Sequence, residues 1–356
     1  MARSLVKLPG LVDVHVHLRE PGATHKEDFE TGTRAAIAGG YTQILDMPNN
    51  TPPTITKEAL NKKINLAQKR IYCDVGFHFG AKASSVKYFK SVSNKVFSLK
   101  VYMNQTTGPL LVNEQKDREL IFKSWQSSLP IMVHAEGDTI EVAIKLAKIY
   151  QRRLHICHVT SDQLESITRA RKENLAISCE VCPHHLFLNT NDATRLGPFA
   201  MMKPSLLTKS GQLKLWDNLH KIDMISTDHA PHTKEEKKDL TSQKFGVPGL
   251  ETTLPLMLTA VSRGLITLER LTQMLCNNPR KIFKLPQQKD TFILVDFAKS
   301  YKITNANLFT KCGWTPFLGH EGRGKVAKVV IRGQTVFENG QFVTMPCGKV
   351  IYPITR

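Results

Sequence analysis

Eight short apolar runs alternate with helical stretches along most of the chain, and this alternation constrains the fold more than any other feature. The runs are rich in Val, Ile and Leu, as strands buried on both faces are. They span residues 11–18, 41–48, 73–80, 98–103, 130–135, 153–159, 176–182 and 224–230. Parallel strands that each lead into a helix form a helix-covered sheet, and eight such units close into a barrel. The sequence therefore predicts an α/β protein with a (β/α)8 TIM barrel.

The helical stretches and a change of pattern near residue 286 set the expected domain organisation. Helices are predicted at 26–39, 57–70, 113–127, 138–152, 161–173, 208–219, 250–262 and 267–276. After residue 286, short β-strands are predicted at 292–296, 325–331 and 334–337, with Asn339-Gly340 as a turn. We expect a barrel over residues 1–285 and a small β-rich extension over 286–356, packed on the barrel. No strand is expected before residue 11.

Composition limits the classes of protein that the chain can belong to. A chain of 356 residues with 41% hydrophobic residues can form one large barrel with a small extension. Uninterrupted apolar runs of about 18 residues are missing, so no transmembrane helix is expected. The segment before the first strand is too short for a signal peptide. The seven cysteines are scattered, which favours a reduced, cytoplasmic chain without a membrane partner.

The formal net charge of +18 has two readings. A basic protein can bind nucleic acid. Here the lysines are spread over the predicted helices, without a dense basic tail or an arginine–aromatic repeat. This distribution favours a solvated, lysine-rich surface and no nucleic-acid partner. A positive field would also speed the capture of a small anionic substrate.

Polar side chains gather where the predicted strands end, at the face that carries the active site in barrel enzymes. His15 and His17 stand two apart, so on a strand they project from the same face. Two interior imidazoles need a shared partner, and a divalent metal ion can be that partner. The same strand end supplies Arg19, and other strand ends supply further candidates, which are Asn49, Lys100, His134, Cys157, His158, Glu180, Asp228 and His232. Metal-dependent chemistry is the first hypothesis for this face.

Some of these side chains have an ordinary structural alternative. Four histidines fit hydrogen-bonded structural roles, namely His155, His184, His185 and His229. Asp228 could cap a helix, but histidines on other strands favour a ligand or proton-transfer group. Lys100 lies in an apolar strand, where a charged amine is costly. It could extend to the barrel mouth or react with carbon dioxide to form a carbamate, and spacing does not choose between these.

Five motifs together resemble the dihydroorotases of the amidohydrolase superfamily. They are Asp13-Val-His-Val-His-Leu-Arg-Glu-Pro-Gly22, Met47-Pro-Asn49, His155-Ile-Cys-His-Val159, Cys179-Glu-Val-Cys-Pro-His-His-Leu186 and Asp228-His-Ala-Pro-His232. The resemblance is strongest to the dihydroorotase domains of animal multifunctional pyrimidine-synthesis proteins, and it covers residues 7–345. The His-x-His pair also occurs in ureases, phosphotriesterases, hydantoinases and allantoinases. Arg19 is more specific, because in dihydroorotases this arginine reads the carboxylate of the substrate.

The resemblance implies a role for each candidate residue. One zinc ion would be held by His15, His17 and Asp228, and a second by His134 and His158, with carboxylated Lys100 bridging both. A third zinc ion would use Cys157 and Glu180. The substrate contacts would be Arg19, Asn49, His232, Lys203 and the backbone at Phe245. Asp228 would also transfer the proton, and Thr106 would lie in a mobile loop over the site. Lys203 stands where arginine is expected, and Thr107 where an aromatic residue is expected.

The implied reaction is the reversible, zinc-dependent cyclisation of N-carbamoyl-L-aspartate to L-dihydroorotate in pyrimidine biosynthesis. The resemblance also implies a homodimer, or a unit of a multifunctional pyrimidine-synthesis assembly. Two alternatives remain open at this stage. One is a related cyclic-amide hydrolase of the hydantoinase or allantoinase kind, which lacks a dedicated carboxylate clamp. The other is a metal-free scaffold homologue.

Overall fold

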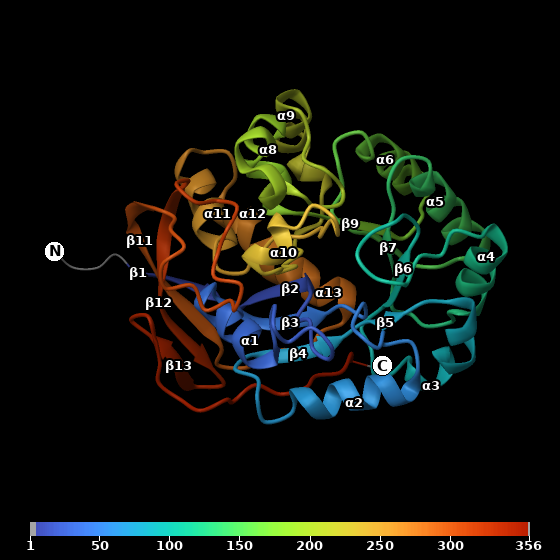
Figure 1. Cartoon of the computed structure of the whole chain (residues 1–356), viewed down its shortest axis with the longest axis horizontal. Coiled ribbons are helices and arrows are strands. Elements are labelled where there is room, and N and C mark those ends of the chain that lie inside the picture. Colours follow the sequence, from blue (N-terminus) through green and yellow to red (C-terminus); the bar gives the residue numbers. More distant parts are fainter. Residues whose placement is uncertain (1–4, 355–356) are drawn as a thin grey trace.

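The computed structural model describes residues 5–354 and contains the predicted barrel (Figure 1). The barrel strands are β2 (Leu11–Val16), β3 (Tyr41–Asp46), β4 (Asp74–Phe77), β5 (Phe79–Gly80), β6 (Leu99–Tyr102), β7 (Ile131–His134), β8 (Leu154–Ile156), β9 (Ile177–Val181) and β10 (Met224–Ile225). They form two parallel groups, β2-β3-β4 and β5 to β10. Only His78 separates β4 from β5, so these two elements correspond to one predicted strand.

The barrel closes between its first and last strands. Val16 forms a parallel bridge with His229, just beyond β10. In addition, the backbone N–H of His17 donates to the carbonyl of His229 at 2.8 Å. This closure places the end of β2 beside the end of β10, although the two lie far apart in the sequence. The predicted TIM-barrel class is confirmed.

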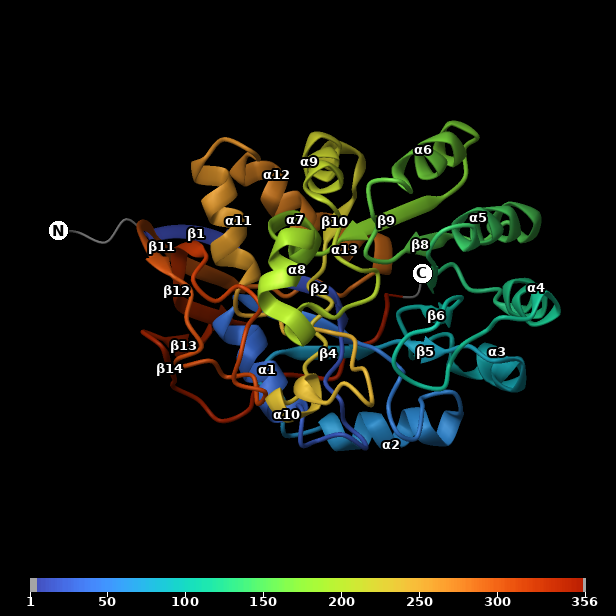
Figure 2. The same cartoon turned by 45° about the horizontal axis from the view of Figure 1, so that its top comes forward.

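Helices cover the outside of the barrel, as Figures 1 and 2 show. The longer ones are α1 (Phe29–Ala38), α2 (Lys57–Ala67), α4 (Gln115–Ser124), α5 (Thr139–Tyr150), α6 (Leu164–Lys172), α9 (Lys209–Asp217) and α11 (Thr253–Ser262). Shorter helices are α3 (Phe89–Val92), α7 (Pro183–Phe187), α8 (Thr190–Leu196), α10 (Lys234–Lys238), α12 (Leu268–Thr272) and α13 (Asn278–Phe283). Side-chain caps fix several starts: Asp28 accepts from the N–H of Thr31 at 2.8 Å, which begins α1. Among residues 5–354, no helix is long and apolar enough to span a membrane.

A second, antiparallel sheet packs beside the barrel (Figure 2). Its order is β1 (Leu5–Pro9), β11 (Phe292–Lys302), β12 (Glu321–Ile331), β13 (Gln334–Glu338) and β14 (Gln341–Phe342). The three strands expected after residue 286 are present, and β11 and β12 are longer than expected. The expectation of no strand before residue 11 is wrong, because Leu5–Pro9 pairs with β11 as an edge strand.

The last part of the described chain returns to the barrel. Val75 in β4 donates to the carbonyl of Lys349 and accepts from the N–H of Ile351, both at 2.9 Å. Arg332, just after β12, pairs with the nearly buried Asp74 at 2.9 Å. The C-terminal segment is therefore joined to the barrel by its backbone and by an ion pair.

A buried ion pair joins helix α2 to the strand ends that carry the candidate site. Lys63 Nζ lies 2.7 Å from Asp46 Oδ2, and both side chains are fully buried. The same ammonium donates to the carbonyl of Met47 and to Asn50 Oδ1, both at 2.6 Å. The other oxygen of Asp46 accepts from the N–H of Leu18 at 2.8 Å. This network fixes the backbone between the histidines of β2 and the loop after β3.

We expect Lys63→Met to destabilise the fold strongly. The substitution keeps most of the apolar stem but leaves Asp46 buried without its cation, which typically costs about 3–5 kcal/mol. Urea unfolding measures the free energy of unfolding directly. Lys62→Met is the matched control, because Lys62 is exposed on the same helix and its substitution should change stability by less than about 0.5 kcal/mol. Similar stability of the two variants would contradict the proposed importance of the pair.

Candidate metal centre

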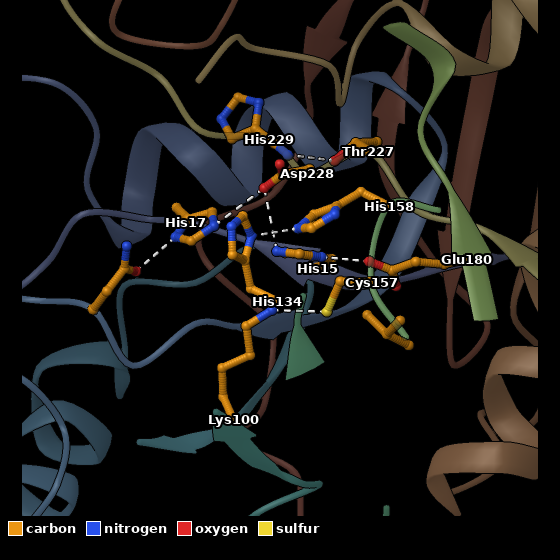
Figure 3. Close-up of polar contacts among 12 residues, drawn as sticks. His15, His17, Lys100, His134, Cys157, His158, Glu180, Thr227, Asp228 and His229 are labelled. Carbon is orange, nitrogen blue, oxygen red and sulfur yellow. Dashed lines mark hydrogen bonds and ion pairs between the residues drawn. The ribbon is translucent and has the colours of Figure 1, made fainter. Parts of the chain in front are cut away.

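The ends of β2 and β10 bring two histidines to one carboxylate (Figure 3). His15 Nε2 and His17 Nε2 each lie 3.2 Å from Asp228 Oδ1. One potential ligand atom from each residue falls within 4.8 Å of the others, and all three residues are buried. The set fits a divalent cation such as Zn²⁺, which prefers imidazole and carboxylate ligands.

The carboxylates in this group shift the pKa values of its histidines. Burial alone would lower the pKa of His15, but the carboxylates of Asp228 and Glu180 raise it to about 10. Burial dominates at His17 and lowers its pKa to about 3. Burial would raise the pKa of Asp228, but the neighbouring histidines lower it below its usual value. The carboxylates of Asp228 and Glu180 thus favour a positive charge at His15, and they would favour a bound cation for the same reason.

A second pair of histidines faces the first group. His134 Nδ1 and His158 Nε2 lie 2.9 Å apart, at the ends of neighbouring strands. Burial lowers the pKa of both rings, so both are neutral and have a nitrogen lone pair to offer. In the described part of the chain, His158 Nδ1 is buried without a hydrogen-bond partner. Two neutral imidazoles at this distance fit a second cation.

Lys100 and Cys157 lie below these histidines (Figure 3). Lys100 is completely buried, and its Nζ donates to Cys157 Sγ at 2.7 Å. Its side chain therefore does not extend to solvent at the barrel mouth, which was one of the two alternatives for this residue. It lines the same pocket as His15, His134 and Asp228.

Glu180 connects two histidines of the barrel interior. It is fully buried, contacts His15 Nδ1, and lies 3.0 Å from His155 Nε2. Burial would raise the pKa of this carboxyl group, but His15 and His155 hold it well below its usual value. A carboxylate in this place orients the ring of a metal-binding histidine. Glu180 also forms, with His15 and Cys157, a second group of potential ligands within 4.8 Å of one another.

The pocket beside the metal donors contains a buried arginine that has no carboxylate partner. Arg19 Nε donates to the carbonyl of Pro231 at 3.0 Å, and Nη2 lies 3.1 Å from His232 Nε2. Among residues 5–354, no carboxylate lies within salt-bridge distance of this guanidinium. Arginine binds carboxylates through two parallel hydrogen bonds. The pocket can therefore bind an anionic ligand next to the metal donors.

The predicted loop after β6 lies over this pocket. Thr107 accepts a hydrogen bond at its carbonyl from Asn49 Nδ2 at 3.2 Å, and its hydroxyl donates to the carbonyl of Phe245 at 3.4 Å. Asn49 also contacts His17 Nδ1 at 2.7 Å. The remaining predicted residues line the pocket as well, namely Thr106, Lys203 and Phe245. Lys203 Nζ stands 5.3 Å from the centre of the Phe245 ring.

Three comparisons agree on the family. The model of the amidohydrolase family matches residues 6–336. The chain is 35% identical to a dihydroorotase of Methanosphaera stadtmanae, over 93% of this chain and 85% of that one. It is also 44% identical to the multifunctional protein CAD of Squalus acanthias and 42% identical to the multifunctional protein pyr1-3 of Dictyostelium discoideum. The chain spans only 15% and 16% of the length of these two proteins. This chain belongs to the amidohydrolase family, among the dihydroorotases.

Solved structures of amidohydrolases share the fold. The L-hydantoinase of Arthrobacter aurescens superposes with a TM-score of 0.92 at 26% identity, covering 97% of this chain and 88% of that one. The inactive dihydroorotase-like domain of a Chaetomium thermophilum CAD-like protein superposes with a TM-score of 0.83 at 26% identity, covering 97% of this chain and 99% of that one. Both an enzyme and an inactive domain therefore have this architecture, so the fold alone does not decide activity.

Two buried residues of this amidohydrolase site were missed by the sequence analysis. Tyr102 lines the pocket, and its buried hydroxyl has no hydrogen-bond partner among the described residues. Burial raises the pKa of Tyr102 well above its usual value, so the phenol remains a donor. It follows Lys100 by two positions on a strand, and this spacing could have identified it. Lys237 is the other, and its run of charged neighbours in the sequence gave no signal of burial.

Lys237 ties together the segments that form one wall of the pocket. Its ammonium donates to the carbonyls of Met201, Lys244 and Gly246 at 2.8, 2.9 and 3.1 Å. Burial, and secondarily the charge of Arg19, lower its pKa to about 7. These carbonyls flank Lys203 and Phe245. Lys237 therefore positions the residues that line the pocket at 203 and 245 without lining the pocket itself.

We expect Lys237→Met to loosen the backbone at 244–246. The carbonyls of Lys244 and Gly246 would lose their donor, while that of Met201 would keep the N–H of Gly246; each unpaired buried group costs about 1–3 kcal/mol. Hydrogen–deuterium exchange of peptides covering 240–250 should therefore become faster than in the parent protein. The exposed neighbour Lys238, changed to Met, is the control and should leave exchange unchanged. Unaltered exchange in Lys237→Met would show that this lysine does not hold the wall.

Proposed function

We propose that this chain catalyses the reversible cyclisation of N-carbamoyl-L-aspartate to L-dihydroorotate, as a zinc-dependent enzyme of pyrimidine biosynthesis. The observation that carries the proposal is the buried, carboxylate-free guanidinium of Arg19 beside the group of metal donors. Both compounds carry an α-carboxylate that can pair with it. The dihydroorotases among the relatives support the same reaction.

We assign the metal ligands as follows. One zinc ion would be held by His15, His17 and Asp228, and a second by His134 and His158, with carboxylated Lys100 between them. Bound zinc would lower the pKa of a water molecule and polarise the reacting carbonyl group. Carboxylation would convert the buried amine of Lys100 into an anion, which suits a place between two cations. Cys157 and Glu180 would hold a third zinc ion.

The remaining side chains bind the substrate and move its proton. Arg19, Asn49 and His232 would hold the α-carboxylate, while Lys203 and the backbone at Phe245 contact the rest of the molecule. In ring closure the ureido nitrogen attacks the side-chain carboxyl carbon, and one carboxylate oxygen leaves as water after it receives the proton of that nitrogen and one proton from solvent. Asp228, whose pKa lies below its usual value, is deprotonated and takes the proton from that nitrogen. In ring opening it returns the proton to the ring nitrogen.

The direct test is a cyclisation assay on zinc-loaded protein, coupled to metal analysis. We expect turnover of N-carbamoyl-L-aspartate with at least two zinc ions per chain. Asp228→Asn should lower turnover by about 10²–10⁴-fold, the usual contribution of acid–base catalysis, while the other ligands retain most of the metal. The exposed Asp239, changed to Asn, is the control and should have parental activity. Parental turnover in Asp228→Asn would remove this residue from the mechanism.

Substrate choice separates a dihydroorotase from a hydantoinase-like hydrolase, the second candidate favoured by the structural similarity to L-hydantoinase. Dihydrouracil lacks the carboxylate and would leave the guanidinium of Arg19 unpaired in the pocket. We expect a strong preference for dihydroorotate over dihydrouracil. Arg19→Lys should weaken that preference at least 10-fold, because lysine cannot form the two parallel hydrogen bonds. Equal hydrolysis of both compounds by the parent protein would support the hydantoinase alternative.

The loop at 103–111 gives a further prediction. The loop leaves the end of β6 and returns to it, because the N–H of Val112 donates to the carbonyl of Tyr102 at 2.8 Å. The buried side chain of Leu110 anchors the loop to the protein. We propose that Thr106 contacts the substrate and that the closed loop excludes water. Thr106→Ala should lower turnover at least 10-fold at saturating N-carbamoyl-L-aspartate with little change in melting temperature. Gln105→Ala, at an exposed position of the same loop, should not. Parental activity of Thr106→Ala would make the loop a simple connection.

We further propose a cytoplasmic homodimer, or a unit of a multifunctional assembly, with a barrel over residues 1–285 and a β-rich extension over 286–356. The similarity to both multifunctional proteins and separate dihydroorotases supports either setting. The metal-free scaffold alternative is less well supported, because every donor residue implied by the family resemblance is present in this sequence.

A further inference from the structure

A separate group of potential metal ligands lies just after β9. It consists of Cys182, His184 and His185, and one potential ligand atom from each lies within 4.8 Å of the others. All three side chains are buried, with exposed fractions of 0%, 2% and 0%. None of them belongs to the zinc ligands assigned above. The group stands at the start of helix α7, in the segment that follows Glu180.

Two ring nitrogens in this group have no hydrogen-bond partner among the described residues. They are His184 Nε2 and His185 Nδ1. The other nitrogen of His185, Nε2, lies 3.1 Å from the carbonyl oxygen of Pro204. A carbonyl can only accept a hydrogen bond, so Nε2 carries the ring proton. Neutral His185 therefore presents a lone pair at Nδ1, as a metal ligand must.

The arrangement is costly unless something occupies it. Each buried polar atom without a partner typically costs about 1–3 kcal/mol, and native proteins pair such atoms with protein groups, water or an ion. Here each of the two imidazoles has an unpaired ring nitrogen, and one ring nitrogen of each lies within 4.8 Å of the thiol sulfur of Cys182. The rings of His184 and His185 meet edge to face, with centroids 4.5 Å apart. The hydrogen bond from His185 to Pro204 resembles those that hold metal-binding histidines in place.

We propose that Cys182, His184 and His185 form an additional zinc site. Thiolate and imidazole are the ligands that Zn²⁺ prefers, and three protein ligands leave one tetrahedral position for a further ligand. When zinc binds, the sulfur–metal bond forms and the thiol proton is released to solvent. This inference concerns metal binding alone and does not depend on the reaction proposed above.

The position of the site suggests what its zinc ion does. His185 reaches the carbonyl of Pro204, and Pro204 follows Lys203, which lines the substrate pocket. A metal ion on His185 would fix the ring and thereby the segment that carries Lys203. The role is structural: the ion would hold the part of the pocket wall that carries Lys203.

The test counts metal ions in three proteins loaded with zinc and dialysed against metal-free buffer. Cys182→Ala should contain one zinc ion per chain fewer than the parent protein. Cys179→Ala is the matched control, because Cys179 is also buried in this segment but belongs to none of the ligand groups. It should retain the parental metal content. Circular dichroism confirms that each variant is folded, and Cys182→Ser replaces Cys182→Ala if the latter is not.

Cadmium gives an independent readout of the same site. Parent protein titrated with Cd²⁺ should show a thiolate-to-cadmium absorption band that Cys182→Ala loses in part and Cys179→Ala keeps. Identical metal content and identical bands in the parent and Cys182→Ala would overturn the proposal. So would a crystal of the zinc-loaded protein in which an ordered water, not a metal ion, lies between His184 and His185.

Discussion

Closure of the barrel between its first and last strands is the constraint on which the site depends. The bridge between Val16 and His229 puts the end of β2 against the segment after β10. This closure lets one carboxylate, Asp228, reach both His15 and His17. The seam is reinforced by Asp13, which is fully buried and accepts from the N–H of Thr227 at 3.1 Å. Burial raises the pKa of Asp13 to about 7. Keeping this carboxylate charged where the first and last strands meet therefore costs free energy.

The backbone around the pocket is held in an unfavourable conformation at three of the residues that line it. Arg19, His158 and Asp228 have φ values of 61°, 35° and 46°, in the left-handed region that L-residues rarely adopt. Each follows a barrel strand and turns its side chain toward the pocket. Such strain persists where the surrounding structure fixes it, and it is common at functional sites. The parallel strands and the buried pair of Lys63 with Asp46 supply that rigid frame.

The site also contains polar groups that the fold alone leaves unsatisfied. The guanidinium of Arg19 has no carboxylate partner in the described part of the chain, and the hydroxyl of Tyr102 and Nδ1 of His158 have no hydrogen-bond partner there. A protein selected only for stability would pair or remove such groups, because each costs free energy when buried. A bound cation or anion would supply these buried groups with the partner that the protein does not provide. The extra group at Cys182, His184 and His185 has the same character, which is why it suggests a ligand of its own.

The sequence by itself determined the barrel and most of the residues that line the pocket. The alternation of apolar runs with helical stretches is a local signal, and so is the two-residue spacing of His15 and His17. Polar residues that end parallel strands must meet at one face, so Lys100, His134, His158 and Asp228 could be expected there. The motif resemblance then added Arg19 as a candidate carboxylate contact, because this arginine is more specific to dihydroorotases than the His-x-His pair is.

Only the tertiary structure decided which of these side chains touch, because the contacts join segments that are distant in the sequence. Glu180 reaches both His15 and His155, and Lys237 binds three carbonyls from two separate segments. The strand Leu5–Pro9 is short and ends in proline, so its identity comes from pairing with β11 and not from its own pattern. Local periodicity fixes which residues face inward on one element. Distances between elements follow from how the closed barrel packs, and no local pattern encodes them.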